Sequence, residues 1–262
     1  AAPVVTNPLN NATGVPINGT ITWNATTGAT FYSLQVADNP SFTSPIINQT
    51  NISATSLAYT NLNYYTNYYL RVKAHNPDGE SDYTSTITFR TIVGIPTNQT
   101  PANGAFSQPL NGTLQWTSVT GATQYDAQIA TDAGFTNIVQ TLSNLPSNSG
   151  NYTGLNNATL YYWRARAKNS EGTGTFSNPT TFTTLIGPAT LISPANNATN
   201  VNPLSGSFTW NAPATATHYR IQVALDNGFT NIVIDQNNLT TTSYNYTNLL
   251  SKTQYYWRVY SF

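Results

Sequence analysis

Short stretches of the chain alternate between apolar and polar residues, and the clearest of them is residues 68–75. Its apolar side consists of Tyr68, Leu70, Val72 and Ala74. Its polar side consists of Tyr69, Arg71, Lys73 and His75. Because successive side chains of a strand point to opposite faces, this alternation predicts a half-buried antiparallel strand. Residues 161–168 show the same alternation, with an apolar side of Tyr161, Trp163, Ala165 and Ala167.

The predicted strand belongs to a long pattern that occurs three times. Trp23, Trp116 and Trp210 recur at a period of roughly 93 residues, and a fixed period of this kind means one structural unit used repeatedly. Each Trp is followed by a Tyr-x-x-Gln stretch, by Phe-Thr and by Tyr-x-Arg. We therefore predict three domains, at residues 1–93, 94–187 and 188–262.

Between the aromatic positions, runs rich in Val, Ile, Thr, Tyr and Phe are separated by clusters of Asn, Gly and Pro. This arrangement is typical of β-sandwiches, so the predicted fold class is all-β. The third unit has no counterpart of Thr180–Thr183 and is expected to lack its closing strand. The boundaries at 94–96 and 187–188 carry proline and little Gly or Ser, which favours limited bending and a rod-like molecule.

Several of these motifs resemble fibronectin type III domains. They are the Trp on an early strand, a closing Thr-Phe-x-Thr, and the spacing Leu-x-x-x-Thr-x-Tyr. The last occurs as Leu62/Thr66/Tyr68, Leu155/Thr159/Tyr161 and Leu249/Thr253/Tyr255. In that family it resembles the tyrosine corner, in which the Tyr hydroxyl bonds to the backbone. Residues 193–199 are similar to phrases in repetitive prokaryotic secreted and surface proteins. The resemblance implies an extracellular repeat protein; it says little about the specific role, because this fold hosts many.

The amino-acid composition indicates a polar surface that carries few charges. Only 7% of the residues are charged, and nine basic residues balance nine acidic ones. A nearly neutral surface argues against nucleic acid as an electrostatic partner. The polar surface consists instead of amides and hydroxyls, since the chain has 34 Asn and 44 Thr. No apolar run approaches the length of a membrane span, so we expect a secreted or cell-surface protein without membrane insertion.

The inventory of catalytic side chains is thin. His75 and His218 are the only imidazoles, and both are expected on outward strand positions facing solvent. The sequence contains no phosphate-binding loop, zinc-ligand spacing or nucleophile elbow. We therefore expect neither an enzyme nor a resident cofactor.

One acidic cluster raises a metal site as an alternative. Asp78, Glu80 and Asp82 alternate within a loop, and calcium takes six to eight oxygen ligands. The loop lacks the distant Glu of a calcium-binding loop, and the second repeat keeps only Glu171 there. A solvated turn is the expected reading, with calcium as the alternative.

A row of outward aromatic and basic residues is the best candidate binding surface. It consists of Tyr69, Arg71, Tyr162, Arg164, Tyr256 and Arg258, beside outward Gln35, Gln128 and Gln222. Aromatic and planar polar groups on a sheet can bind sugar rings or a protein. The alternative is cross-strand packing, in which these side chains cover one another.

Asn-x-Ser/Thr sequons are numerous and mildly enriched over the number expected from composition. Asn18 and Asn111 occupy the same position before the Trp strand, and Asn151 and Asn245 share another. Asn11 and Asn197 are further candidates. Glycosylation requires an organism with the machinery, so it stays conditional.

The incomplete third unit predicts an open strand edge carrying Tyr256, Arg258, Tyr260 and Phe262. An unpaired edge is a template for strand addition, so self-association into a filament is one expectation. A segment cut from a longer array is the other. The predicted function is an extracellular structural or adhesive repeat protein whose partners are proteins, with glycans as a further possibility. The alternative is a carbohydrate-binding or spacer array attached to a secreted glycoside hydrolase or other polymer-degrading enzyme.

Overall fold

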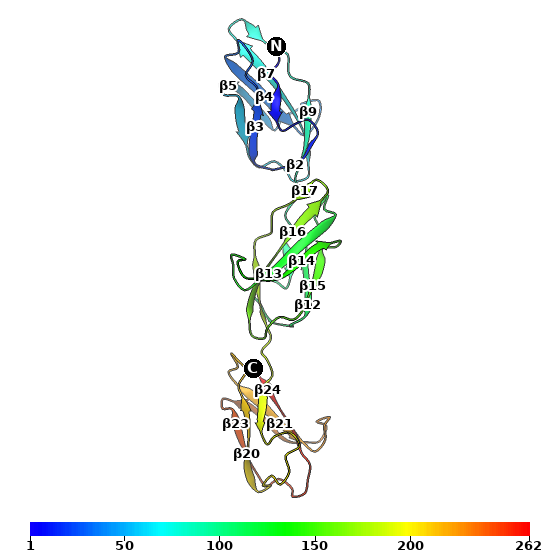
Figure 1. The fold of residues 1–262 in the computed structure, drawn as a ribbon, viewed down its shortest axis with the longest axis vertical. Coiled ribbons are helices and arrows are strands. Elements are labelled where there is room, and N and C mark those ends of the chain that lie inside the picture. Colours follow the sequence, from blue (N-terminus) through cyan, green and yellow to red (C-terminus); the bar gives the residue numbers. More distant parts are fainter. The chain divides into compact units, whose positions relative to one another are not determined.

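A computed structural model describes all 262 residues and contains 24 strands and no helix (Figure 1). The all-β prediction is therefore confirmed. The chain groups into two compact units. The first consists of residues 1–101, 113–150 and 162–180, and the second of residues 102–112, 151–161 and 181–262. The strands nevertheless pair only within residues 5–91, 98–184 and 190–261, so the sheets follow the sequence repeat.

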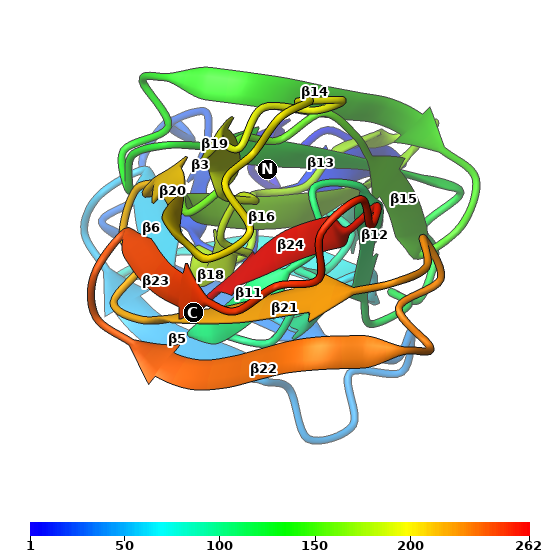
Figure 2. The same cartoon turned by 90° about the horizontal axis from the view of Figure 1, so that it is seen from below.

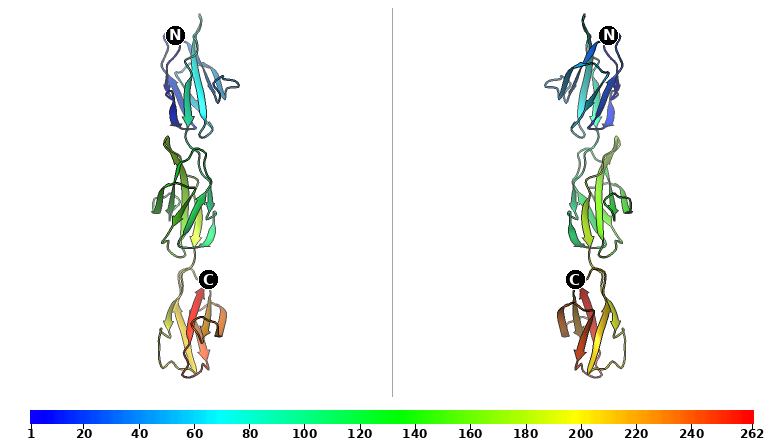
Figure 3. Two further views of the ribbon diagram at one scale, coloured as in Figure 1. Left: turned by 90° about the vertical axis from the view of Figure 1, so that its right-hand side faces the viewer. Right: turned by 90° about the vertical axis from the view of Figure 1, so that its left-hand side faces the viewer.

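Residues 5–91 form two facing sheets, seen as two layers in the blue to cyan part of Figure 3. The smaller sheet contains β1 (Val5–Asn7), β3 (Gly19–Trp23) and β6 (Ser56–Tyr59). The larger sheet has the order β2 (Ala12–Val15), β9 (Ile87–Thr91), β7 (Asn67–Asn76), β4 (Phe31–Ala37) and β5 (Ile47–Ile52). The short strand β8 (Gly79–Glu80) pairs with the end of β7.

Residues 98–184 repeat this arrangement. The smaller sheet contains β10 (Asn98–Thr100), β12 (Gly112–Trp116) and β15 (Ser149–Tyr152). The larger has the order β11 (Ala105–Gln108), β18 (Thr180–Thr184), β16 (Leu160–Asn169), β13 (Gln124–Ala130) and β14 (Ile138–Leu145), with β17 (Gly172–Thr173) beside β16.

Residues 190–261 lie in the second unit and form two three-stranded sheets. One contains β19 (Thr190–Ser193), β20 (Ser205–Asn211) and β23 (Ser243–Thr247). The other has the order β22 (Ile232–Leu239), β21 (Tyr219–Ala224) and β24 (Tyr256–Ser261), which Figure 2 shows side by side.

The apolar sides predicted from the alternation form the cores. On β7, Leu70 and Val72 are fully buried, and on β16 Trp163 and Ala165 are fully buried. The Trp of each repeat packs against the Tyr that follows it on the next strand, with ring centroids 5.5, 5.7 and 5.5 Å apart. Burying such aromatic side chains supplies much of the stabilisation of a small sandwich.

Two tyrosines in each repeat tie loops to the core through hydrogen bonds. The hydroxyls of Tyr68, Tyr161 and Tyr255 accept a backbone N–H from five residues upstream, at 2.9, 3.0 and 2.8 Å. This contact matches the tyrosine corner expected from the Leu-Thr-Tyr spacing. A second hydroxyl, on Tyr59, Tyr152 or Tyr246, donates to a carbonyl near the start of the Trp strand. It lies so close to Gly19, Gly112 or Gly206 that a Cβ there would come within 2.7, 2.6 or 2.3 Å, which explains the glycine.

Candidate functional site

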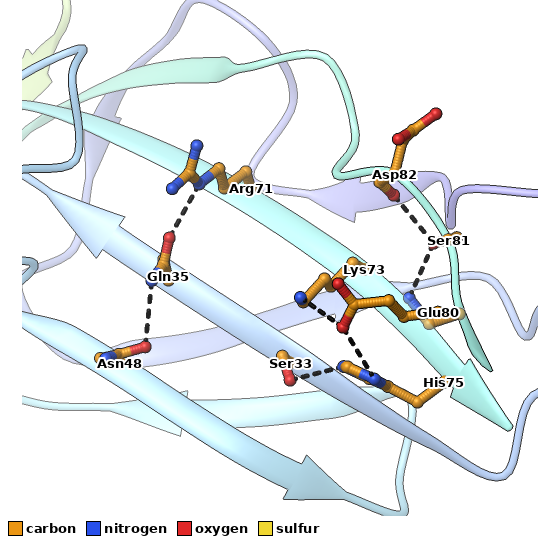
Figure 4. Close-up of polar contacts among 10 residues, drawn as sticks. Ser33, Gln35, Asn48, Arg71, Lys73, His75, Glu80, Ser81 and Asp82 are labelled. Atoms are coloured by element: carbon orange, nitrogen blue, oxygen red, sulfur yellow. Dashed lines mark hydrogen bonds and ion pairs between the residues drawn. The ribbon is translucent and has the colours of Figure 1, made fainter. Parts of the chain in front are cut away.

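In the first repeat, Arg71 and Gln35 of the predicted outward row lie on the face of β7 and β4 that points away from the core (Figure 4). Arg71 donates from Nε to Oε1 of Gln35 at 2.8 Å, and Gln35 donates in turn to Asn48 at 3.1 Å. The guanidinium lies between two aromatic rings, 4.0 Å from the centroid of Phe42 and 4.1 Å from that of Tyr83. A cation between two π faces is held by electrostatics and by packing, so this arginine is engaged within the fold.

The other repeats build the same cluster. Arg164 donates to Gln128 and lies 3.9 Å from Phe135 and 4.2 Å from Phe176. Burial, together with the charge of Arg166, lowers the pKa of Arg164 below its ordinary range. In the third repeat Arg258 donates to Gln222 and lies 3.9 Å from Phe229 and 5.1 Å from Tyr260. We refer to this arrangement as the arginine–aromatic cluster.

The sequence analysis missed the aromatic members of this cluster. Phe42, Phe135 and Phe229 all adopt a positive φ, of 54°, 56° and 55°. Bulky residues rarely occupy this region, so the turn must hold them there. Asp132 does this in the second repeat by accepting the N–H groups of Thr136 and Asn137, which lower the pKa of its carboxyl below the ordinary 3.8. The recurring Phe-Thr after each Gln strand was the available signal.

The geometry favours the packing interpretation of the outward row over a free binding platform. Tyr69, Tyr162 and Tyr256 are half-buried, and the arginines beside them are stacked and hydrogen-bonded. Gln222 lies on the outward side beside Arg258, as predicted, but it is only 3% exposed. It is covered because it donates to Asp235 and accepts from Arg258.

A second group beside the cluster has the composition of a nucleophile relay. The Ser33 hydroxyl lies 2.7 Å from Nε2 of His75, whose Nδ1 is 3.4 Å from the Glu80 carboxylate (Figure 4). Lys73 donates to the same carboxylate at 2.6 Å. The ring of Phe31 stacks on the imidazole at 4.6 Å. The expectation that His75 faces solvent is wrong: its side chain is 14% exposed, because Phe31, Ser33 and Glu80 surround it.

Burial argues against nucleophilic chemistry at this group. Ser33 is only 4% exposed, so an acyl substrate cannot reach the hydroxyl without displacing the side chains that cover it. The adjacent cavity, of about 230 Å³, is lined by His75 and Glu80 but not by Ser33. The relay therefore satisfies buried polar atoms, as polar groups inside a fold require. We refer to it as the Ser33–His75 group.

In the second repeat, the strand position that corresponds to Ser33 carries a buried carboxylate, Asp126. Asp126 is 4% exposed; it accepts from Arg166 at 2.9 Å, from Lys168 at 3.0 Å and from the backbone of Asn144 at 3.0 Å. Burial opposes its ionisation, but these three donors outweigh burial and hold the pKa of Asp126 below its ordinary 3.8. We refer to it as the Asp126 group.

The third repeat uses a more exposed ion pair. Arg220 donates two hydrogen bonds to Asp235, at 2.7 and 2.5 Å, and Gln222 donates a third at 3.0 Å. These donors, that of Arg220 first, lower the pKa of Asp235 to about 2. His218 stacks on Phe262 at 5.0 Å, which mirrors Phe31 on His75 with the two residue types exchanged between strands. His218 lies outward as predicted, but it is half-buried rather than open to solvent.

The acidic loop does not gather a set of metal ligands. Glu80 is taken by Lys73 and His75, while Asp78 and Asp82 lie on exposed backbone. No group of three or more His, Cys, Asp or Glu side chains in the chain could hold a metal ion. The geometry therefore gives no support to calcium binding by Asp78, Glu80 and Asp82.

The sequons differ in whether their amide nitrogen is available. The six candidates, Asn11, Asn18, Asn111, Asn151, Asn197 and Asn245, are all exposed. Asn18 and Asn111 each use their side-chain oxygen to accept a loop N–H at 2.7 Å, which gives their shared position a structural reason. By contrast, Asn98 donates from its amide nitrogen to Trp163 and Thr180, so a sugar could not be accommodated there in this fold.

The predicted open edge of the third repeat lies on β24, which pairs with β21 on one side. Tyr256 and Arg258 are half-buried, whereas Tyr260 is 40% and Phe262 47% exposed. None of the chain's elements is a helix long and apolar enough to cross a membrane.

Comparison with known proteins finds similarity to a curated sequence and to solved structures. The mouse protein Fibronectin type III domain-containing protein 7 is 31% identical over 176 residues, which are 67% of this chain and 22% of that protein. The chain thus spans about a fifth of this relative's length. A crystal structure of chicken CNTN1 FN1-FN3 domains aligns over 99% of this chain and 92% of its own, at 16% identity and a TM-score of 0.31. No family model matches the chain.

Proposed function

The chain carries fibronectin type III-like domains, and from this premise we propose that it is an extracellular structural or adhesive module. The observation that supports this most directly is the arginine–aromatic cluster. In every repeat, the side chains best suited to bind a ligand are hydrogen-bonded and stacked on one another. A sandwich whose polar groups reinforce its sheets is suited to bearing load or presenting loops.

The near-neutral surface also supports a structural role outside the cell. With nine basic and nine acidic residues, the chain has no strong field to attract polyanions or anionic lipid. Exposed sequons at Asn18, Asn111, Asn151 and Asn245 are compatible with passage through a glycosylating pathway. A prokaryotic source and filament formation by strand addition at β24 stay predictions.

Single-molecule pulling on the full chain tests the load-bearing role. Each repeat should unfold in its own step, and about 93 residues at 3.3–3.6 Å each extend by roughly 30 nm. Steps of this length at resolvable force would support the proposal. Extension without resolvable steps would contradict a load-bearing role, and antibody labelling found only in permeabilised cells would contradict an extracellular one.

A further inference from the structure

The strand β14 forms one edge of the larger sheet of the second repeat. The sheet order places β13 on one side of it and no strand of the chain on the other. An edge strand presents unpaired N–H and C=O groups, which can pair with a strand of another molecule. The first two residues of β14 are aliphatic and exposed, Ile138 by 41% and Val139 by 49%.

Proteins usually protect such edges with charges, proline or short length, and β14 has none of these. Its eight residues, Ile-Val-Gln-Thr-Leu-Ser-Asn-Leu, include no charged side chain and no proline. The corresponding strand β5 has six residues and is preceded by Pro45. On β22, Asp235 provides a charge. The opposite edge, β11, has only four residues. Among these edges, β14 is therefore the one with no charge, preceding proline or short length; its pairing with β13 shifts register twice, as does that of β22 with β21.

We propose that β14 pairs with β14 of a second copy of this chain, antiparallel about a two-fold axis, so that one sheet continues across two molecules. This rests on the proposed structural role and names its partner. A second copy fits because the formal net charge is zero, so like molecules do not repel each other. The side chains of β14 are aliphatic, amide or hydroxyl groups. A two-fold axis therefore places neutral side chains of one copy beside neutral side chains of the other.

The expected dimer is weak. A single strand edge of eight residues buries much less than the roughly 800 Å² per partner of a standard interface. Dissociation constants weaker than about 1 μM are expected for so small a contact.

Sedimentation velocity of the full chain over a wide concentration range tests the proposal. The wild type should shift from monomer to dimer as concentration rises, and the β14 amides should gain hydrogen-exchange protection over the same range. Val139→Lys places a charge on the edge and should abolish both effects. Thr175→Lys is the matched control, because it adds the same charge at an exposed loop position of the same repeat, outside any sequon, and should leave dimerisation unchanged.

Two results would overturn the proposal: a wild type that stays monomeric at every concentration, or dimerisation equally strong in Val139→Lys. Near-ultraviolet circular dichroism of each variant verifies its fold, since Val139 is half exposed and its replacement should not disturb the core. If the chain stays monomeric but still unfolds in resolved steps under force, the β14 dimer is ruled out and the proposed structural role stands.

Discussion

The outward faces of the first and second repeats use the same strand positions for different chemistry. In the first, Ser33 bonds to His75, and Glu80 bridges His75 and Lys73 at an exposed position. In the second, a buried Asp126 takes two cations and a backbone N–H. The inward faces of the same strands differ far less, since both carry the Trp–Tyr pair at nearly equal ring separation.

This difference shows what the fold demands at each face. The inward side chains must fill a fixed volume, so shape restricts them. The outward ones must only leave no buried donor or acceptor unpaired, and several sets of residues can do that. The two groups should therefore contribute unequally to stability, because the second contains a buried charge and the first does not.

The largest effect is expected from Asp126→Ala. Removing the carboxylate takes an acceptor from Arg166, from the Asn144 N–H and from Lys168, which keeps its bond to the Asn144 side chain. This should cost about 3 kcal/mol of unfolding free energy. The low end of the usual range applies because both cations reach solvent. Ser33→Ala is the matched change in the first repeat and should cost about 1 kcal/mol. Hydrogen exchange of the β13 and β4 amides reports each repeat separately; equal costs would refute the comparison.

The next effect tests an inward difference between the two repeats. Trp163 occupies the position of Leu70, packs against Trp116 and donates to the carbonyl of Pro101 at 3.1 Å. Trp163→Leu removes buried volume and one hydrogen bond, so we expect roughly 2 kcal/mol of destabilisation. Trp116→Phe should cost less, because the Trp116 indole N–H has no partner to lose. Urea unfolding followed by fluorescence compares the two, and a larger loss for Trp116→Phe would contradict the argument.

Placing the first repeat's polar residues in the second repeat tests whether the Ser33–His75 group and the Asp126 group are interchangeable. Asp126→Ser combined with Lys168→His places the residues of the first repeat at the same register positions of the second. A Ser–His hydrogen bond should replace the ion pairs, so the double variant should lose only about 1 kcal/mol relative to wild type. It should be more stable than Asp126→Ala in the same exchange experiment. A double variant as unstable as Asp126→Ala would mean that the two groups are not interchangeable.

Acid should destabilise the second repeat through Asp126. Its pKa is lowered in the folded state, so its contribution is present above the ordinary value of 3.8 and is lost as pH falls through the folded pKa. Asp235, with a pKa of about 2, should act likewise in the third repeat between about pH 4 and pH 2. Asp126→Asn should flatten the acid dependence of β13 amide exchange while leaving that of β21 unchanged.

The smallest effect is expected from Glu80→Gln. The Glu80 carboxylate is exposed. Its hydrogen bond to Lys73 is the largest of the interactions that lower its pKa, and salt and solvent weaken an exposed ion pair of this kind. We expect no resolvable change in the melting temperature of the chain. A clear drop in the melting temperature that persists at high salt would mean that the Ser33–His75 group stabilises its repeat as strongly as the Asp126 group does.

The period of the Trp residues and the alternation at residues 68–75 and 161–168 were sufficient to predict the sheets and the buried faces, whereas the tyrosine corner was expected from the resemblance to fibronectin type III domains. These features depend on neighbours in sequence or on a repeated template. His75, His218 and Gln222 lie on outward positions, as predicted, but they are partly or fully covered, because outward on a strand does not mean exposed. Whether a neighbouring strand or loop covers a position depends on residues far away in the chain, such as Asp235 for Gln222.

By itself the sequence determined an all-β repeat with aromatic cores, a neutral surface rich in amides, and few groups capable of catalysis. The stacking of Arg71, Arg164 and Arg258 between aromatic rings became evident only from the tertiary structure. So did the different hydrogen-bond partners of Ser33 and Asp126, which occupy equivalent strand positions. The tertiary structure also identified β14 as the unprotected edge. The reason is physical: periodicity follows from local backbone geometry, whereas pairing, stacking and coverage depend on which distant segments the fold brings together.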